Sequence, residues 1–469
     1  MNWEEKREFL KKQLNYNDEK KQMRHNLENG FNLVPFKTRG DDKIDYATIV
    51  ESIKELAKTV SGKTLEGKLD IEEIVESILS GEYLQYENES DRDFFRSVLK
   101  VFLERELLGE RVKNPYFLKF TPFQGKDKKI KDTSNYMFCN LMNSSEKIQK
   151  FFHTPHTETL ISKLVVRELE RRMAPLKNME KEVLRMEERE PLFPDFIQCF
   201  NEDMEYLVRY PEQFLKNMGL FFNYYLMRYV FQLVFNINLC HRGQFQNIDE
   251  LFFALDSETI SMKRASYNYG YRYFKENSLK TYYHMNTLEH LGIFLSEPPF
   301  LYSKLENSYL ILETCERDNF ISSLNLWMEE YSEANRIEGY QKVEHSSQFR
   351  DIYWNYLSLI EKAHSTKEKR GTYLRYSSAI EEICRENFLK ARGSLGYTFN
   401  LSQSFILLLT RLCVKENSIQ VKELFLRFQR RGIFLDRNSK EAVITILEKN
   451  NLLEKNSDGG EVQYVKAVL

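Results

Sequence analysis

Residues 402–435 read SQSFILLLTRLCVKENSIQVKELFLRFQRRGIFL, and residues 436–469 read DRNSKEAVITILEKNNLLEKNSDGGEVQYVKAVL. Ser402 stands directly before an apolar stripe at helical spacing, which is the position of an N-cap residue. Residues 421–431 repeat the helical spacing and stop at Gly432, where a C-cap glycine is expected. The quoted sequence therefore predicts two short helices at its start.

The rest of this sequence predicts a third helix and a β-hairpin. Apolar residues recur at helical spacing over 439–450. Short apolar runs then flank the glycine-containing segment 456–460, as strands flank a hairpin turn. With a short strand or turn at 418–420, the order helix, strand, helix, helix, hairpin is that of a winged helix-turn-helix. We therefore predict a winged helix-turn-helix domain over residues 397–469.

The composition predicts a mainly α-helical chain of more than one domain. The chain has 469 residues, of which 42% are hydrophobic, and its 34 Phe and 27 Tyr provide side chains for a substantial core. It contains only 18 Gly and 10 Pro, which favours long helices. Because the formal net charge is only −2, any affinity for nucleic acid has to come from local basic clusters.

Two further regions precede the predicted winged helix. Residues 1–40 read as a polar N-terminal helix, over residues 1–30, and an extended link. Residues 41–396 read as a multi-helix body with a subdivision near 191–194, where two prolines stand close together.

Three segments of the body carry specific expectations. Residues 157–188 predict one long charged helix that Pro175 kinks or divides. Residues 393–396, Gly-Ser-Leu-Gly, predict a linker to the winged helix. Residues 214–240 are strongly apolar but are interrupted by charges, whereas a membrane-spanning helix needs about 20 mostly apolar residues. We expect a buried core helix there, no contact with a membrane, and a cytoplasmic protein.

No motif predicts a catalytic site, a metal site or a cofactor. The SGKT sequence at 61–64 resembles the end of a phosphate-binding loop, but Ala57 stands where that loop needs its first glycine. His153 and His156 stand three positions apart with Glu158 nearby, but a metal site needs at least one further converging ligand. Glu-Gly-Lys at 66–68 is only half of a nuclease arrangement. The six cysteines are scattered, which is typical of buried thiols in a reducing cytosol.

An alternation of tyrosines is the first candidate for nucleic-acid binding. Tyr267, Tyr269, Tyr271 and Tyr273 alternate, with basic residues around them. Aromatic faces stack on bases and basic groups follow phosphates, so this composition is typical of a site for single-stranded nucleic acid. The alternatives are a half-buried strand and a packed tyrosine surface.

The second candidate is a basic cluster in the predicted winged helix, at its second helix and the loop that follows. The cluster consists of Arg427, Arg430, Arg431, Arg437 and Lys440. It would neutralise several phosphates and position DNA without reading its sequence. The third helix is nearly neutral, and Asp458 and Glu461 at the hairpin tip repel phosphate. DNA contact and docking of a partner protein therefore both stay open.

The C-terminal sequence resembles the DptG family, components of the bacterial DNA phosphorothioation-dependent restriction system. The resemblance lies in Gly432-Ile433-Phe434-Leu435-Asp436, in the helix that follows, and in Ser457-Asp458-x-Gly460-Glu461-x-Gln463-Tyr464-Val465. The early segment Pro35-Phe36-Lys37-Thr38 is similar as well, and the middle agrees in size and composition. Glu461 stands where the family is expected to have Asp.

The resemblance implies a cytoplasmic, non-catalytic subunit of an anti-phage assembly. Its partners would be DptF, an ATPase-like protein, and DptH, a helicase-like protein. The assembly attacks DNA that lacks the phosphorothioate mark. The family has no catalytic motif, so the resemblance transfers no catalytic residue.

The sequence thus predicts a non-catalytic adaptor that engages DNA within such a complex. One alternative is a metal-dependent nuclease whose active-site residues are dispersed in the sequence. Another is a winged-helix transcription regulator, which is disfavoured because the third helix lacks the usual base-reading side chains at its start.

Overall fold

The computed structural model is mainly α-helical, as the composition predicts, and divides into two compact units. Unit 1 comprises Met1–Asp45, Met227–Ala254 and Glu258–Asn400, and unit 2 comprises Tyr46–Leu226, Leu255–Ser257 and Leu401–Leu469. The structure describes residues 2–17, 19–20, 22–23, 33–36, 43–65, 69–81, 84–108, 112–122, 124–142, 146–155, 159–175, 192–243, 247–295, 301–365, 370–455 and 463–467.

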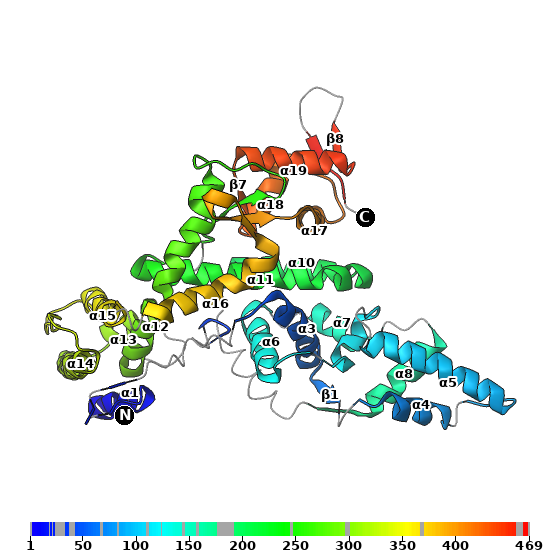
Figure 1. Cartoon of the computed structure of the whole chain (residues 1–469), viewed down its shortest axis with the longest axis horizontal. Helices are drawn as coiled ribbons and strands as arrows, with labels where there is room; N and C mark the ends of the chain where they lie inside the picture. Colours follow the sequence, from blue (N-terminus) through cyan, green and yellow to red (C-terminus); the bar gives the residue numbers. More distant parts are fainter. Residues whose placement is uncertain are drawn as a thin grey trace. The chain divides into compact units, whose positions relative to one another are not determined.

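Unit 1 combines long helices with a small sheet (Figure 1). Its helices are α1 (Trp3–Gln13), the second part of α11 (Pro211–Leu239), η4 (Cys240–Arg242), η5 (Tyr267–Tyr271), α12 (Arg272–Leu295), α13 (Tyr302–Leu310), α14 (Thr314–Asn335), α15 (Phe349–His364), α16 (Arg370–Phe388) and η6 (Gly393–Leu395). Its strands lie in the order β4 (Leu389–Ala391), β5 (Tyr397–Leu401) and β3 (Phe252–Leu255).

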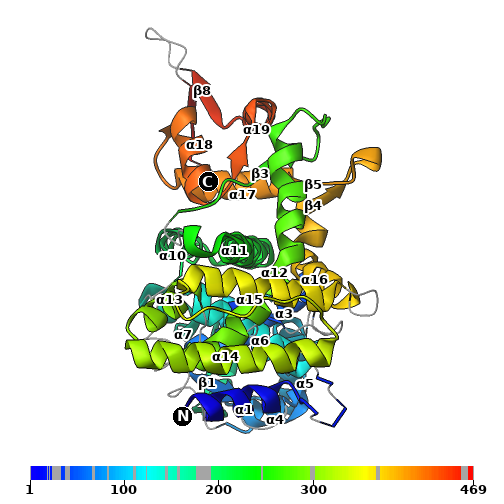
Figure 2. The same cartoon turned by 90° about the vertical axis from the view of Figure 1, so that its left-hand side faces the viewer.

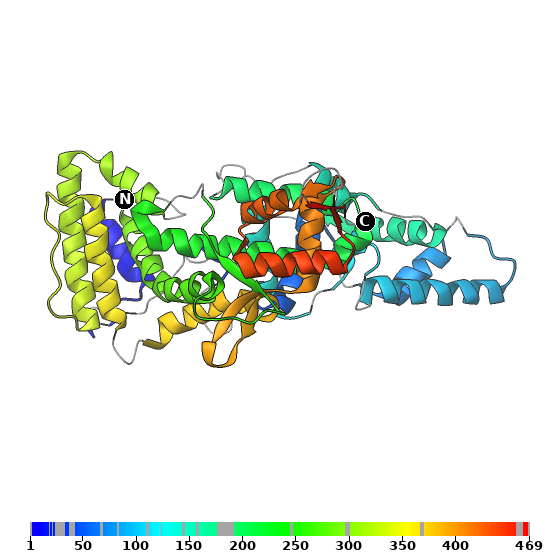
Figure 3. The same cartoon turned by 90° about the horizontal axis from the view of Figure 1, so that it is seen from above.

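Helix α12 organises unit 1, because α1, α13, α15 and α16 all pack against it. Helices α14 and α15 lie side by side, as both Figure 2 and Figure 3 show, and α1 packs on α14. Aromatic side chains fill the space between these helices. For example, the Trp327 indole donates a 2.7 Å hydrogen bond to the Tyr356 hydroxyl, which also contacts His290 Nδ1 at 2.7 Å. Burial lowers the pKa of His290 to about 3, so this core histidine is neutral.

Unit 2 contains the remaining elements. They are α3 (Tyr46–Ser61), β1 (Lys63–Leu65), α4 (Ile71–Leu79), α5 (Glu89–Leu103), η2 (Glu104–Leu108), η3 (Pro115–Phe120), α6 (Asp127–Leu141), α7 (Glu146–His153), α8 (Leu160–Arg171), β2 (Met173–Pro175), α10 (Pro194–Leu207), the first part of α11, α17 (Gln403–Val414), β6 (Ile419–Gln420), α18 (Val421–Arg430), β7 (Phe434–Leu435), α19 (Arg437–Lys449), β8 (Leu453–Lys455) and β9 (Gln463–Val465).

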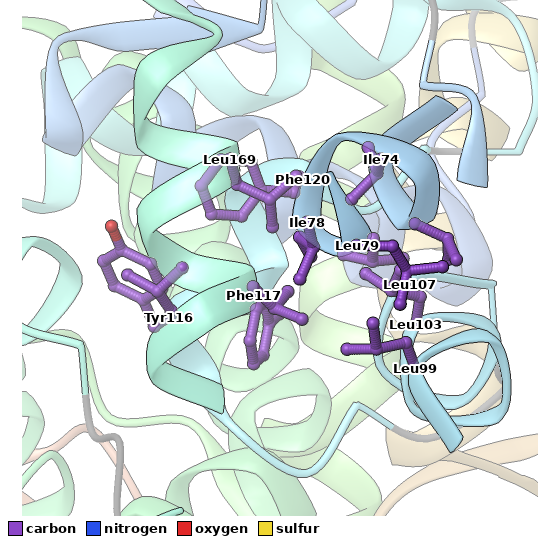
Figure 4. Close-up of a cluster of buried hydrophobic side chains, with 13 residues drawn as sticks. Ile74, Ile78, Leu79, Leu99, Leu103, Leu107, Tyr116, Phe117, Phe120 and Leu169 are labelled. Carbon is purple, nitrogen blue, oxygen red and sulfur yellow. The ribbon is translucent and has the colours of Figure 1, made fainter. Parts of the chain in front are cut away.

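One hydrophobic cluster of unit 2 holds α4, α5, η2, η3 and α8 together (Figure 4). Its labelled members are Ile74, Ile78, Leu79, Leu99, Leu103, Leu107, Tyr116, Phe117, Phe120 and Leu169. These side chains are nearly inaccessible to water, so their apolar surface stabilises the packing of all five helical segments.

The carboxylate of Glu170 lies beside this hydrophobic cluster. Glu170 accepts hydrogen bonds from the Tyr116 hydroxyl, from Lys119 Nζ at 3.1 Å and from Lys63 Nζ at 2.9 Å. Burial alone would raise the pKa of Glu170, but the hydrogen bonds from Tyr116 and Lys63 and the charge of Lys119 lower it to about 2. The ionised carboxylate therefore connects α8 with η3 and β1.

Helix α11 corresponds to the buried core helix that the sequence predicts over 214–240. Its side chains are buried nearly all round between Phe221 and Phe235. Within the described ranges of the chain, no helix is both long enough and apolar enough to cross a membrane.

Three local predictions differ from the structure. The helix predicted over 1–30 ends at Gln13, and Asn15 has a φ of 48°, which a continuing helix does not allow; residues 24–32 lie outside the described residues. The long helix predicted over 157–188 ends at Arg171, because residues 173–175 pair with β1 as strand β2, with Pro175 opposite Lys63. Residues 176–191 are not described.

The third difference concerns residues 393–396, which were expected to link the body to the winged helix. They form the turn of the hairpin between β4 and β5 instead, and the Arg392 amide donates to the Gly396 carbonyl at 2.6 Å. Both glycines have positive φ, 59° and 76°, which the tight turn requires.

Replacing Glu170 tests the charged group. Its depressed pKa means that the carboxylate stabilises the fold above pH 4.5 and loses this effect as the pH falls towards 2. We expect Glu170→Gln to lower the free energy of unfolding at pH 7 by about 2 kcal/mol. The difference from wild type should shrink between pH 4.5 and 2 in urea unfolding curves.

The matched control is Glu89→Gln, since the Glu89 side chain is 83% exposed. Its effect at pH 7 should be below about 0.5 kcal/mol. A difference between wild type and Glu170→Gln that is constant over this pH range would contradict the assignment.

Candidate nucleic-acid interface

The C-terminal part of unit 2 contains three helices and a three-stranded sheet (Figure 1). Strand β9 lies in the centre of the sheet and pairs antiparallel with β6 and β8, so that Val465 stands opposite both Ile419 and Leu453. The order along the chain is α17, β6, α18, β7, α19, β8 and β9. The hairpin tip, with Asp458 and Glu461, lies outside the described residues.

Local signals in the sequence place these helix ends correctly. The Ser402 hydroxyl accepts a hydrogen bond from the Phe405 amide at 3.2 Å and caps α17, as predicted. Gly432 follows α18 with a φ of 81°, which confirms the predicted C-cap glycine. Helix α19 begins two residues before the predicted start, because the Asp436 carboxylate caps it through the Ser439 amide at 3.1 Å.

Arg431, which the sequence places in the phosphate-binding cluster, is buried. Its side chain is 4% exposed and pairs with Asp203 of α10, which is fully buried. Arg431 Nε and Nη2 donate to the two oxygens of Asp203 at 2.6 Å and 2.5 Å. This is a bidentate pair, the geometry in which arginine binds a carboxylate most strongly. Arg431 therefore has no side-chain surface for a DNA phosphate.

Neighbouring groups complete the hydrogen bonding around this pair. The Tyr225 hydroxyl donates to Asp203 at 2.6 Å, and the Tyr224 hydroxyl donates to the Arg431 carbonyl at 2.5 Å. Burial raises the pKa of the Tyr225 phenol, and the adjacent Asp203 charge raises it further, so the phenol keeps its proton. Because each buried charge is paired and hydrogen-bonded, the network holds the C-terminal part of unit 2 on α10 and on the middle of α11.

Arg427 is also committed to internal contacts. Its Nε donates to Glu423 at 2.8 Å, an ion pair one turn apart on α18. Its Nη1 donates to the Cys413 carbonyl at 2.6 Å, which satisfies one of the backbone acceptors that the end of α17 leaves open. The half-buried Arg427 thus ties α18 to α17, and only part of its charge is available to a ligand.

The other three members of the predicted cluster reach solvent. Arg430 is exposed at the end of α18. Arg437, at the start of α19, has a side chain that is 90% exposed and pairs with Glu441 at 3.0 Å. Lys440 is half-buried, and its ammonium lies 5.6 Å from the centre of the Phe425 ring. The structure therefore divides the predicted basic cluster into two internal arginines and three residues at the surface.

The four alternating tyrosines lie in unit 1 on a helix and not on a strand. Tyr267 to Tyr271 form the π-helical turn η5, which is kinked at Tyr269 and Gly270, and Tyr273 lies in α12. Gly270 is required at the kink, since a Cβ there would stand 2.8 Å from the Phe252 carbonyl oxygen. Residues two apart do not share one face of a helix, so the tyrosines do not form a single stacking platform.

Two of these tyrosines are half-buried and make specific contacts within unit 1. The Tyr271 hydroxyl donates to Glu381 at 2.8 Å, and Tyr273 stacks on Phe235 with ring centres 5.0 Å apart. Tyr267 is half-buried. Tyr269 is 59% exposed and offers a ring for stacking. These tyrosines therefore do not lie on a half-buried strand. Tyr271 and Tyr273 instead fit the other alternative, a packed tyrosine surface.

The weak motifs have ordinary structural positions. The SGKT sequence follows the order helix, turn, strand, from α3 through Gly62 into β1, whereas a phosphate-binding loop connects a strand to a helix. His153 ends α7, and His156 and the Glu-Gly-Lys sequence at 66–68 lie outside the described residues. Among the residues that are described, no three His, Cys, Asp or Glu side chains gather in a group that would hold a metal ion.

Comparison of the chain with known protein families and with curated proteins gives no match to either.

The ion pair between Asp203 and Arg431 yields a stability prediction. Asp203→Asn leaves a buried arginine without its counter-charge and should lower the free energy of unfolding by about 3–5 kcal/mol. Arg431→Met should do the same by leaving the carboxylate unpaired. The double variant should be destabilised by much less than the sum, which chemical denaturation of all four proteins would measure.

The exposed pair Arg437–Glu441 is the control, since the same type of cycle there should give a coupling below about 1 kcal/mol. Additive effects of Asp203→Asn and Arg431→Met would show that the two charges do not stabilise each other.

Proposed function

We propose that the C-terminal region predicted over 397–469 forms a winged helix from Leu401 onward, because residues 397–400 belong to unit 1 in strand β5. Two observations support this proposal: the order of the elements along the chain and the order of the strands in the sheet both match those of a winged helix. In a winged helix, the first helix is followed by a short strand, then by two helices and by a hairpin whose second strand pairs with that short strand. Here α17, β6, α18 and α19 come in this sequence, and β9 lies between β6 and β8. Helix α19 is then the counterpart of a recognition helix.

We propose further that this winged helix contacts the phosphate backbone of duplex DNA. The observation that carries this proposal is that Arg430 and Arg437 are exposed, and Lys440 is half-buried, around the end of α18 and the start of α19. Cationic side chains at a helix start can approach phosphates, and the affinity that they give does not depend on base sequence. The remaining exposed charges of α19 include Glu441 and Glu448, so we expect positioning on DNA and weak sequence preference.

The wider role that we propose is a non-catalytic adaptor in a phosphorothioation-dependent anti-phage restriction complex, in the cytoplasm. This part rests on the resemblance to the DptG family. In the structure, Gly432–Asp436 leads from α18 into α19, and Gln463–Val465 forms β9, so these two stretches of the resemblance fall within the proposed winged helix. Pro35 and Phe36 of the early segment belong to unit 1. The partners would be the DptF-like ATPase and the DptH-like helicase, and the winged helix would hold the complex on DNA.

A triple variant tests the DNA contact. Arg430→Gln, Arg437→Gln and Lys440→Gln together should weaken binding to a duplex of about 20 base pairs by 10-fold or more at 0.1 M salt. The slope of log affinity against log salt should fall by about 2–3, because each lost phosphate contact removes about 0.9 from it. Fluorescence anisotropy in a salt series measures both quantities.

The matched control removes three exposed lysines of unit 2 outside the C-terminal part, Lys126, Lys128 and Lys150, which changes the net charge equally. This control should keep the wild-type slope. If both triple variants lose affinity to the same degree, binding follows net charge and the proposed interface is wrong. If neither loses affinity, the winged helix does not contact DNA.

A further inference from the structure

A pocket in unit 2 has no role in the function proposed above. It has a volume of about 480 Å³ and lies where α10 ends, α11 begins and α17 ends, with Ala467 beyond β9 also on its wall. Its polar lining includes Arg209, Arg411 and Lys415, and its apolar lining includes Tyr210 and Pro211. None of the residues proposed to contact duplex DNA belongs to it.

Arg411 is the unusual member of this lining. It is only 8% exposed, and its Nε has no hydrogen-bond acceptor among the described residues, although its side chain also hydrogen-bonds with the Tyr206 hydroxyl. Among the described residues no carboxylate forms an ion pair with it, and its guanidinium stands 5.5 Å from the centre of the Tyr210 ring. A cation–π contact compensates a buried charge only in part. A buried cation on the wall of a pocket therefore lacks a counter-charge.

The start of α11 adds a second attraction for anions. The first amide of this helix with a backbone acceptor is that of Phe214, which donates to the Tyr210 carbonyl at 2.9 Å. The amides of Glu212 and Gln213 come before it, in the turn where helical amides lack an intrahelical partner. The positive end of the helix dipole thus faces the same pocket as Arg411.

The other charged side chains of the pocket largely compensate each other. Arg209 pairs with Glu416 at 3.0 Å, and Lys415 lies 4.0 Å from Glu202. Glu212 is exposed to solvent at the first turn of α11. Two charges of the lining therefore have no ion-pair partner among the described residues, the buried positive charge of Arg411 and the solvent-exposed negative charge of Glu212.

We propose that this pocket binds the phosphate group of a phosphate monoester, either a free mononucleotide or the phosphorylated 5′ end of a DNA strand. The planar guanidinium of Arg411 matches two phosphate oxygens, and the first-turn amides of α11 match a third. The pocket is larger than a phosphate needs, and Tyr210, Pro211 and Ala467 offer apolar surface to the attached sugar and base. This inference does not depend on the winged helix contacting duplex DNA.

The test compares a nucleotide with its nucleoside, so that only the phosphate differs. Adenosine monophosphate at millimolar concentration should raise the melting temperature of the wild-type protein, and adenosine should not, because only a ligand of the folded state stabilises it. In Arg411→Met the shift should disappear. Without ligand this variant should melt at or above the wild-type temperature, since it removes an uncompensated buried charge and keeps an apolar stem.

Two further variants show whether loss of the shift reflects loss of ligand binding or a folding defect. Arg411→Lys keeps the charge without the planar fork and should retain part of the shift, with an affinity reduced about 10-fold. The Arg430→Gln, Arg437→Gln, Lys440→Gln variant should keep the full shift. Broadening of the ³¹P resonance of inorganic phosphate by wild-type protein provides a measurement that requires no variant.

Short DNA single strands with and without a 5′ phosphate show whether the bound phosphate group belongs to a free ligand or to a DNA end. A shift with adenosine monophosphate or inorganic phosphate indicates a free ligand, and a shift with only the phosphorylated strand indicates a DNA end; both support the phosphate site. Equal effects of nucleotide and nucleoside, no effect of any phosphate probe, or a full shift in Arg411→Met would overturn it.

Discussion

The fold of unit 2 depends on the ion pair between Asp203 and Arg431. Two charges leave water completely, and this is tolerable only because the pair is bidentate and because Tyr225 hydrogen-bonds to the carboxylate. The pair connects α10 with the residue that ends α18, more than 200 positions later in the chain. It therefore fixes the C-terminal helices to the rest of unit 2 and determines which basic side chains remain at the surface.

This arrangement separates cations with internal contacts from cations at the surface within one short sequence. Arg427 and Arg431 are spaced one helical turn apart and both point into unit 2, towards Cys413 and Asp203. Arg430 lies on the exposed side of the same helix, and Arg437 and Lys440 continue from the start of α19. Arg411 represents a third situation, because it is buried like Arg431 but has no carboxylate partner among the described residues. The roles that we propose for these arginines differ because some are buried and paired internally, whereas others are exposed or lack a carboxylate partner.

Much of the local structure could be predicted from the sequence, because it depends on neighbours in the chain. The cap at Ser402, the glycine at 432 and the helical spacing over 421–431 are of this kind. Within the predicted basic cluster, Arg430 and Arg437 are exposed and Lys440 is half-buried. The burial of Arg431 depends on Asp203, and that of Arg411 on the ends of α10 and α11, and neither contact leaves a periodic signal. Strand β2 was mistaken for helix because its pairing with β1 joins segments about 110 residues apart.

The central claim is that the C-terminal helices, held in place by Asp203, present the surface that meets DNA. Hydrogen–deuterium exchange of the full chain, with and without a saturating DNA duplex, tests it most directly. The account predicts new protection of backbone amides over 430–449, with α12 and α14 of unit 1 unchanged. Protection confined to unit 1, or unchanged exchange over 430–449 with DNA bound, would contradict it.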